Sequence, residues 1–308
     1  MKVLLTGATS FTGMWFAEAL ARSGATVTAV VRGQGGEYQG TRLDRLQRVR
    51  QCAQVVEGVE FGDDGFLSLV AKKEFDVLCH HAARVTDYRS PDFDVGLALA
   101  ENTRNFRRVL ETMRDKGLKG VVATGSVFEQ DEGIGDHPVR AFSPYGVSKG
   151  LSWQVAQYWC TTVGLPLGKF VISNPFGPFE EPRFTAYLIR CWREGSVAEV
   201  RTPAYLRDNI HVDLLALAYT NFVRGLVATG RDARLGPSGY RESQGSFTER
   251  FAAEMRPRLK LDCRISLMAQ RDFPEPIVRL NPDTPDTAAL GWDEGHAWDG
   301  VAEFYRQP

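Results

Sequence analysis

A tyrosine, a lysine and a threonine in this sequence are spaced so that they could move a proton together. Tyr145 and Lys149 lie four residues apart at the start of 144–163, whose apolar spacing predicts a helix, so both side chains should share one helical face. An ammonium group beside a phenol stabilises the phenolate and lowers the tyrosine pKa from about 10 toward the range useful for proton transfer. Thr124 ends a predicted strand and could place its hydroxyl on the same substrate oxygen. The three residues predict an acid/base centre.

A glycine-marked turn near the N-terminus has the context of a dinucleotide-binding site. The predicted strand 3–5 is followed by Thr6-Gly7-Ala8-Thr9-Ser10-Phe11-Thr12-Gly13 and then by a predicted helix. In such a turn the first glycine permits the tight bend, the last permits close helix packing, and backbone N–H groups at the helix start bind a diphosphate. Ser10 stands where a middle glycine is usual, and its hydroxyl could donate a hydrogen bond. The alternative is an ordinary strand–helix turn.

Residues after the second and third predicted strands bear on the choice of cofactor. Dinucleotide sites commonly carry an acid after the second strand to bind the ribose hydroxyls, whereas an arginine there suits a 2′-phosphate. This chain has Arg32, which favours NADP over NAD, because a guanidinium pairs bidentately with phosphate. The alternative is an exposed arginine at a strand end. Asp63 could accept from an adenine amino group or cap the next helix, and the sequence does not choose between these.

These residues must be positioned by alternating strands and helices in the first 170 residues. Apolar runs predict strands at 3–5, 26–31, 55–61, 76–79, 120–124 and 168–172, and helical spacing predicts helices at 12–23, 64–72, 93–116 and 144–163. A loop and a short helix are expected within 34–50. This order predicts an α/β fold with a doubly wound, Rossmann-like parallel sheet.

The amino-acid composition changes after Asn174-Pro175-Phe176-Gly177-Pro178, where proline and arginine become more frequent. The stretch 209–226 is again apolar and helical, which suggests a return to the sheet. We therefore predict a nucleotide-binding domain from 1–173 and 209–236, interleaved with a smaller substrate-binding domain from 174–208 and 237–308.

Composition excludes several classes of protein. The chain has 308 residues, 43% of them hydrophobic, and its 37 Lys and Arg against 38 Asp and Glu leave a formal net charge of -1, which provides no field for nucleic acid or anionic lipid. Its five cysteines form no CxxC pair, and no apolar run approaches the roughly twenty residues of a membrane span. We expect a cytoplasmic protein with no membrane or nucleic-acid partner.

Other chemistry-bearing residues have plain structural alternatives. His80 and His81 are adjacent on a predicted strand and should face opposite ways, so no metal site is expected there or elsewhere. The acidic run Glu129-Gln130-Asp131-Glu132 lies near two glycines and is interpreted as a solvated loop beside the substrate cleft. The aromatic side chains of Trp153, Tyr158 and Trp159 suit a core or a helix–helix dimer seam.

Taken in order, these motifs resemble the extended short-chain dehydrogenase/reductase family, within its NAD(P)-dependent epimerase/dehydratase group acting on nucleotide sugars. The matching segments run along nearly the whole chain and comprise the glycine turn, Asp63, 76–83, Asn102, 124–128, 145–149, 173–178, 207–213 and Leu290-Gly291-Trp292. The resemblance implies that Tyr145 is the acid/base, Lys149 its partner and ribose contact, and Thr124 the third catalytic hydroxyl.

The same resemblance implies two sets of binding residues. The cofactor set comprises Gly7, Thr9, Ser10, Phe11, Thr12, Gly13, Arg32, Asp63, Asp64, His81, Ala82, Ala83, Thr124, Tyr145 and Lys149. The substrate set comprises Arg84, Ser126, Asn174, Arg183 and Arg207; within it Asn174 would meet the diphosphate and Arg207 the nucleotide phosphate or ribose, although an ion pair or a turn would also explain them.

Departures from the family pattern narrow the expected reaction. Relatives that dehydrate sugars usually carry an acid just after the catalytic hydroxyl, where this chain has Gly125 and Ser126. Because Arg32 favours NADPH, the main expectation is an oxidoreductase that reduces a keto group, at C4, of a nucleotide-activated deoxysugar. A nucleotide-sugar 4-epimerase with tightly bound NAD is the alternative, and a non-catalytic dinucleotide-binding sensor is a third. Helices 93–116 and 144–163 could form the four-helix seam of a homodimer.

Overall fold

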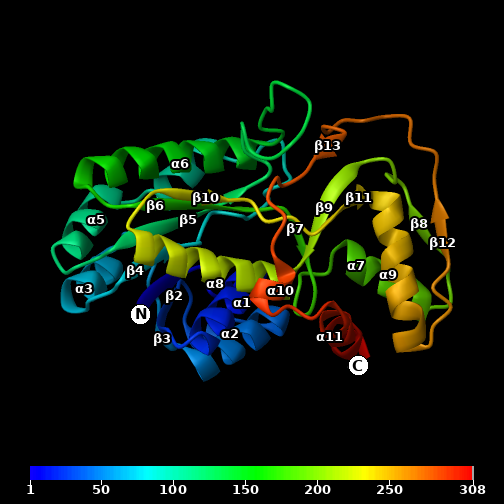
Figure 1. Ribbon diagram of the computed structural model, residues 1–308, viewed down its shortest axis with the longest axis horizontal. Helices are drawn as coiled ribbons and strands as arrows, with labels where there is room; N and C mark the ends of the chain where they lie inside the picture. Colours follow the sequence, from blue (N-terminus) through cyan, green and yellow to red (C-terminus); the bar gives the residue numbers. More distant parts are fainter. Residues whose placement is uncertain (307–308) are drawn as a thin grey trace.

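A seven-stranded parallel sheet forms the centre of the larger part of the molecule. The computed structural model describes residues 1–306. The sheet has the order β10-β6-β5-β4-β1-β2-β3, and every neighbouring pair is parallel (Figure 1). Its strands are β1 (Lys2–Thr6), β2 (Thr26–Val31), β3 (Gln54–Glu57), β4 (Val77–His80), β5 (Gly120–Ser126), β6 (Leu167–Ile172) and β10 (Ala233–Leu235). The strand order reverses between β1 and β4, as in a doubly wound Rossmann-like sheet, which confirms the predicted fold class.

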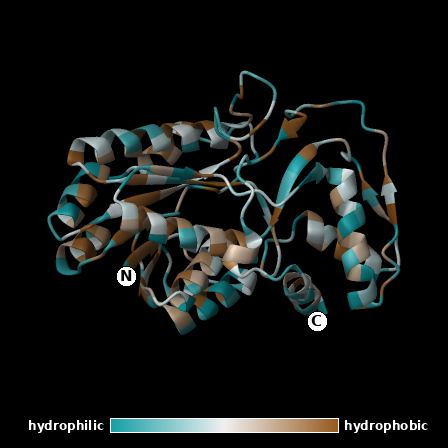
Figure 2. Cartoon of the chain, viewed as in Figure 1, coloured by the Kyte–Doolittle hydropathy of each residue, from teal (hydrophilic) through white to brown (hydrophobic). Residues whose placement is uncertain are grey.

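Helices cover both faces of this sheet. One face carries α1 (Phe11–Arg22), α2 (Gly40–Cys52) and α8 (Val212–Thr229), which pack around a core containing Phe16, Leu46 and Tyr219. The other face carries α3 (Asp64–Lys72), α5 (Phe106–Arg114) and α6 (Pro144–Val163), around Phe66, Leu110 and Cys160. Figure 2 shows hydrophobic colour along the central strands and mixed colour around the covering helices, the pattern of helices with one buried face.

The smaller part of the molecule has its own core and short strands. Its elements are β7 (Asn174–Phe176), α7 (Phe184–Arg193), β8 (Ala198–Val200), β9 (Leu206–His211), β11 (Tyr240–Ser243), α9 (Gln244–Leu259), β12 (Ile265–Leu267), β13 (Val278–Arg279), α10 (Thr287–Leu290) and α11 (Glu294–Arg306). Strand β9 pairs with β7, β11 and β13, and β8 pairs with β12. Phe176, Trp192, Phe251 and Trp298 form the centre of this second core. The domain boundaries given above stay a prediction.

Three predicted elements differ from the observed ones. The helix expected at 93–116 is two helices, α4 (Val95–Asn102) and α5, because Asn105 adopts a left-handed φ of 51° and its side-chain amide donates to the Gly62 carbonyl at 2.8 Å. The helix expected from 209 begins at Val212, since 209–211 pair with β7. The third strand ends at Glu57, before Gly58 with φ 68°.

The segment 34–50 contains more helix than expected. A one-turn helix, η1 (Gly35–Glu37), precedes the 13-residue α2. Among residues 1–306, none of the helices combines the length and apolar character that a membrane span would need.

Candidate active site

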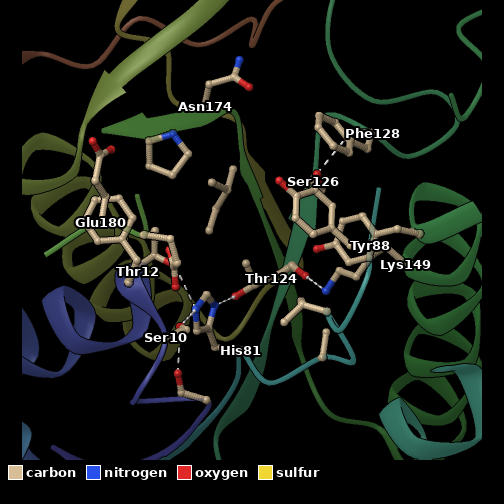
Figure 3. Close-up of a pocket in the computed structure, with 18 of the residues that line it drawn as sticks. Ser10, Thr12, His81, Tyr88, Thr124, Ser126, Phe128, Lys149, Asn174 and Glu180 are labelled. Carbon is tan, nitrogen blue, oxygen red and sulfur yellow. Dashed lines mark hydrogen bonds between the residues drawn. The ribbon is translucent and has the colours of Figure 1, made fainter. Parts of the chain in front are cut away.

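One large pocket lies where the carboxyl ends of β1, β4 and β5 meet the smaller part of the molecule. Its volume is about 1180 Å³, and residues from both parts of the chain line it. Figure 3 shows Ser10 and Thr12 on one side of this pocket, Lys149 on the other, and His81 and Thr124 between them. In open parallel sheets, ligands bind at this kind of switch point. This volume exceeds the roughly 300–1,000 Å³ of pockets that hold one drug-sized ligand.

The glycine turn has the close packing that the sequence predicts. Gly7 has φ 74°, and a Cβ at Gly13 would lie 2.2 Å from the Gly7 carbonyl oxygen. The Ser10 hydroxyl, however, is used inside the turn: it donates to the Gly7 carbonyl at 2.9 Å and accepts from the Gly13 N–H at 3.1 Å. The expected Ser10 hydrogen bond to a ligand is therefore replaced by a helix cap. Phe11 and Thr12 are the first residues of α1, so their N–H groups have no intrahelical acceptor and can bind an anion.

The three predicted catalytic residues lie in this pocket, but the lysine does not act on the tyrosine as expected. The Lys149 ammonium donates to the backbone carbonyl of Thr124 at 2.5 Å. Burial, and then the negative charge of Glu129, raises the pKa of Tyr145 above its usual value. The expected lowering is thus wrong for this geometry, because Lys149 is bound to the strand and its own pKa is lowered by burial. A positive charge placed close to the phenol would lower its pKa.

Aromatic rings fix the direction of the Tyr145 side chain. Tyr88, Phe93 and Phe128 pack edge-on against it, with ring centroids 5.6, 6.0 and 6.2 Å away. Tyr145 is the second residue of α6, which begins at Pro144 and is capped by the side chain of Ser143. The helix start therefore sets the backbone of Tyr145, and the rings set its phenol.

The two adjacent histidines point to different surroundings. The His80 Nε2 atom lies 2.9 Å from the Asn102 carbonyl, and its ring packs on Phe61. The His81 ring lies in the pocket, in contact with Ser10, Thr12 and Thr124 (Figure 3). Burial lowers the pKa of His80 to about 4 and that of His81 to about 3, so both imidazoles are neutral at pH 7.

At the far end of the glycine turn, two arginines and one acid line the pocket. Arg32 is half-exposed and lies 3.6 Å from Glu60, and Arg42 on α2 reaches the Thr9 hydroxyl at 3.4 Å. Sequence reasoning missed Arg42 and Glu60, although Arg42 lies in the arginine-rich segment after Arg32.

Three predicted cofactor residues lie outside the pocket lining within residues 1–306, namely Gly13, Asp63 and Asp64. The carboxylate oxygens of Asp63 accept from the N–H groups of Phe66 at 2.6 Å and Glu60 at 2.8 Å. The helix-capping alternative for Asp63 is therefore the one that the structure shows, while Asp64 is in the first turn of α3.

The five predicted substrate residues all line the pocket, but three of them, Arg207, Asn174 and Arg84, have partners of their own. The Arg207 guanidinium donates to the carbonyls of Leu206, Pro276 and Ile277 and pairs with Glu275 at 3.0 Å. Arg207 therefore anchors the loop before β13. The alternative role given above for Arg207, an ion pair, is the one that the structure shows. The Asn174 amide donates to the Asp208 carbonyl at 3.2 Å and joins β7 to β9. Arg84 pairs with Glu101 at 2.8 Å, whereas Ser126 and Arg183 keep groups facing the pocket (Figure 3 for Ser126).

Within the acidic run at 129–132 the two glutamates are buried, whereas Gln130 and Asp131 are exposed. Glu129 is 0% exposed and Glu132 is 5% exposed, and both pair with the Lys169 ammonium, at 2.7 and 2.6 Å. Glu132 also pairs with Arg234. The solvated-loop interpretation is therefore wrong for Glu129 and Glu132, because Lys169 on β6 supplies a buried charge partner for both. A lysine inside an apolar strand was the signal that could have revealed this cluster.

Glu180 is a pocket residue that sequence reasoning missed. Its carboxyl is buried and accepts from the Tyr305 hydroxyl at 2.9 Å, and burial raises its pKa to about 8. Phe179 before it has a left-handed φ of 69°, and its carbonyl accepts from the buried Arg45 guanidinium at 2.8 Å. Arg45 on α2 therefore fixes the turn that carries Glu180 by its hydrogen bond to the Phe179 carbonyl.

Comparison with known proteins agrees with this geometry. The UDP-glucose 4-epimerase of Mycolicibacterium smegmatis is 25% identical over 228 residues, which cover 69% of this chain and 70% of that protein. The UDP-glucuronic acid 4-epimerase of Bacillus cereus, solved with UDP-glucuronic acid and NAD, superposes with TM-score 0.74 at 16% identity over 100% of this chain and 99% of the other. The dTDP-glucose 4,6-dehydratase DesIV of Streptomyces venezuelae, solved with NAD, gives 0.72 at 18% identity over 100% and 97%. The two structures share the fold.

A family description also matches most of the chain. The sequence description of the NAD dependent epimerase/dehydratase family matches residues 3–230, a segment that includes the glycine turn, Thr124, Tyr145 and Lys149. Because this match covers most of the chain, the protein is an enzyme of the NAD dependent epimerase/dehydratase family.

Proposed function

We propose that the protein is a nucleotide-sugar 4-epimerase that keeps NAD bound through the reaction. The observation that carries this proposal is the convergence of Thr124, Tyr145 and Lys149 with the N-terminus of α1 in one pocket of about 1180 Å³. The comparisons favour this function over the keto-sugar reductase expected first from the sequence, since the related proteins named above include two 4-epimerases.

The residues of the glycine turn fit a dinucleotide. Gly7 has a positive φ and Gly13 packs against the Gly7 carbonyl, so no side chain at either position covers the backbone of the turn. The N–H groups of Phe11 and Thr12 would hold the diphosphate. Lys149 would orient the nicotinamide ribose, and Ala82 and Ala83 would border the cofactor. The nicotinamide, when bound, supplies an acceptor and donor of hydride at the sugar carbon.

Tyr145 carries the proton in this proposal. Its phenolate takes the proton of the C4 hydroxyl as the alcohol becomes a ketone, and its phenol returns that proton as the ketone becomes the epimeric alcohol. Thr124 forms a hydrogen bond with the same oxygen. Inversion requires the ketone to present its other face before it is reduced, so the sugar must turn over inside the pocket, and the large pocket volume supports this.

The structure also bears on dehydration, which needs an additional acid and base near the ring. A Cβ at Gly125 would lie 2.9 Å from the Lys169 side chain and 3.1 Å from a Glu129 carboxylate oxygen. The buried ion pairs therefore leave no room for an acidic side chain at 125, and Ser126 cannot supply one. We accordingly favour epimerisation over dehydration.

A keto-sugar reductase that uses NADPH is the second candidate. Arg32 and Arg42 both line the pocket beside Thr9, and two arginines suit a 2′-phosphate. Glu60 supports the opposite choice, because a carboxylate at the same place suits the ribose hydroxyls of NAD.

One experiment separates these candidates. The purified protein is incubated with UDP-glucose, UDP-glucuronic acid, their N-acetylated analogues and a 4-keto sugar nucleotide, each with and without added NADPH or NADH. An epimerase converts one of them to its C4 epimer without added cofactor. A reductase consumes NADPH in proportion to product and needs a 4-keto sugar nucleotide. Turnover of neither kind would contradict both proposals.

A further prediction concerns the assembly of two copies of the chain. Helices α4 and α6 expose Leu97, Val147 and Tyr158, which supports the proposed homodimer through these helices. Analytical ultracentrifugation of the protein and of a Tyr158→Glu variant tests this dimer, and we expect the variant to sediment as a monomer.

The proposed substrate-binding domain at 174–208 and 237–308 is supported by the separate core around Phe176.

A further inference from the structure

The His81 imidazole lies between the glycine turn and the predicted catalytic hydroxyl, and the mechanism above does not use it. Its Nδ1 atom is 3.0 Å from the Thr124 hydroxyl oxygen. Its Nε2 atom is 3.0 Å from the Thr12 hydroxyl oxygen and 3.1 Å from that of Ser10. Figure 3 shows these contacts as one chain of side chains across the pocket floor. The ring therefore connects the helix terminus that would bind a diphosphate to the residue that would contact the sugar.

Hydrogen-bond accounting assigns the proton of this imidazole. The Ser10 hydroxyl has one proton, which it donates to the Gly7 carbonyl at 2.9 Å, so Ser10 can only accept from His81. A proton on Nε2 satisfies that contact, with Thr12 as a second acceptor. A lone pair on Nε2 would instead face a lone pair of Ser10 at 3.1 Å. The proton therefore belongs on Nε2, and Nδ1 is an acceptor.

The ring is held in this orientation and stays uncharged. Phe16 packs edge-on against it, with ring centroids 5.0 Å apart. Burial, strengthened by the nearby Lys149 ammonium, keeps the His81 pKa at about 3. A neutral imidazole with its proton on Nε2 offers only an acceptor to Thr124, so the Thr124 hydroxyl must donate to Nδ1.

We infer that His81 is a positioning residue that turns the Thr124 proton toward Nδ1 and so leaves a Thr124 lone pair available to the substrate. Thr124 then accepts a hydrogen bond from the C4 hydroxyl of the sugar and holds the alcohol forms of the substrate. Tyr145 alone donates to the oxygen of the ketone. This role of Thr124 rests on the proposed function, whereas the arrangement of His81 does not.

The arrangement is tested without any substrate by nitrogen NMR of the histidine side chains. The protein, labelled with ¹⁵N-histidine, has five histidines, and the spectrum of His81→Asn identifies the signals of His81. We expect Nδ1 in the unprotonated range and Nε2 in the protonated range from pH 5.5 to 8. Thr124→Val should shift the Nδ1 signal and leave Nε2 in place, and Thr124→Ser should restore it. A proton on Nδ1, or an Nδ1 chemical shift that does not change in Thr124→Val, would overturn the inference.

The effect on turnover is tested with two variants of His81. Asparagine can place its Oδ1 atom near the position of Nδ1 and accept from Thr124, whereas leucine cannot. We expect His81→Leu to raise KM for the sugar nucleotide about tenfold, as the loss of one hydrogen bond of roughly 1.4 kcal/mol would, with a smaller change in kcat. His81→Asn should recover most of this loss, and Thr124→Val should add little to His81→Leu.

The two tests fail in different ways. Equal losses in His81→Leu and His81→Asn, or additive losses with Thr124→Val, would overturn the role of His81 in substrate binding. If the NMR result is as expected and no nucleotide sugar is epimerised by the unaltered protein, the proposed function fails and the arrangement of His81 stands. Thermal unfolding of each variant, expected within a few degrees of the parent protein, shows that the fold is kept.

Discussion

Glu180 makes this protein less stable as the pH rises through neutrality, and Glu180→Gln should remove that dependence. The carboxyl is buried in the pocket wall and accepts from the Tyr305 hydroxyl. Burial raises its pKa from 4.5 to about 8, so the folded protein binds a proton that the unfolded chain releases. An acid with a raised pKa favours folding below that pKa, and the advantage disappears as the pH rises toward it. Glutamine resembles the protonated acid but does not titrate.

The magnitude follows from the number of protons bound. Between pH 6 and 7.5 the folded state holds almost one more proton at this site than the unfolded state, and each pH unit then costs about 1.4 kcal/mol of unfolding free energy. The parent protein should therefore lose roughly 2 kcal/mol over this interval through Glu180 alone. The difference in stability between Glu180→Gln and the parent should grow by the same amount.

Urea unfolding at pH 6, 6.5, 7 and 7.5 measures this difference. Glu181→Gln is the matched control: burial acts to raise the pKa of Glu181, but the Arg45 and Arg183 charges outweigh it and hold that pKa below its usual value, so Glu181 does not titrate in this range. That variant should be less stable than the parent by the same amount at every pH. Taking differences cancels the titration of the buried histidines, which acts in the opposite direction below pH 6.5. If Glu180→Gln tracks the parent at all four pH values, the carboxyl is ionised in the folded protein and the reasoning is wrong.

Three other predictions test separate parts of the site. Tyr145→Phe should lower turnover by about 10²- to 10⁴-fold while thermal unfolding stays unchanged, since only the hydroxyl of a packed ring is lost; an active variant would contradict its role as acid/base. Lys169→Met should destabilise the fold by about 3–5 kcal/mol, because it leaves the buried Glu129 carboxylate without a cation and Glu132 with Arg234 alone, and adding Glu129→Gln and Glu132→Gln should recover much of this loss in urea unfolding. Arg42→Ala should weaken NADPH binding more than NADH binding by calorimetry, and equal effects would remove the support for a reductase.

Much of the sheet could be predicted because its signals are local. Each strand is a short apolar run, each covering helix repeats its apolar residues every three or four positions, and these patterns do not depend on distant residues. The helix break at Asn105 could not be predicted in this way. Its left-handed conformation is stabilised by the Gly62 carbonyl, 43 residues earlier in the chain.

Prediction of the site failed where partners come from another element. The carboxyls of Glu129 and Glu132 resemble a solvated loop until Lys169 is placed beneath them by the pairing of β5 with β6. The pKa of Tyr145 cannot be obtained from the spacing to Lys149, because Lys149 binds the strand that carries Thr124. Spacing on a helix identifies which side chains share a face, but the contacts of that face decide their charge.

The fate of the hydrogen at C4 tests the central proposal most directly. The purified protein is given a UDP-sugar deuterated at C4, without added cofactor, and the epimeric product is analysed by mass spectrometry and proton NMR. Because the hydride would pass to a retained cofactor and back to the same carbon, we predict an epimer that keeps its deuterium at C4, even with a large excess of unlabelled water. An epimer that has exchanged this deuterium with solvent, or a labelled substrate that returns unchanged, would contradict the proposal.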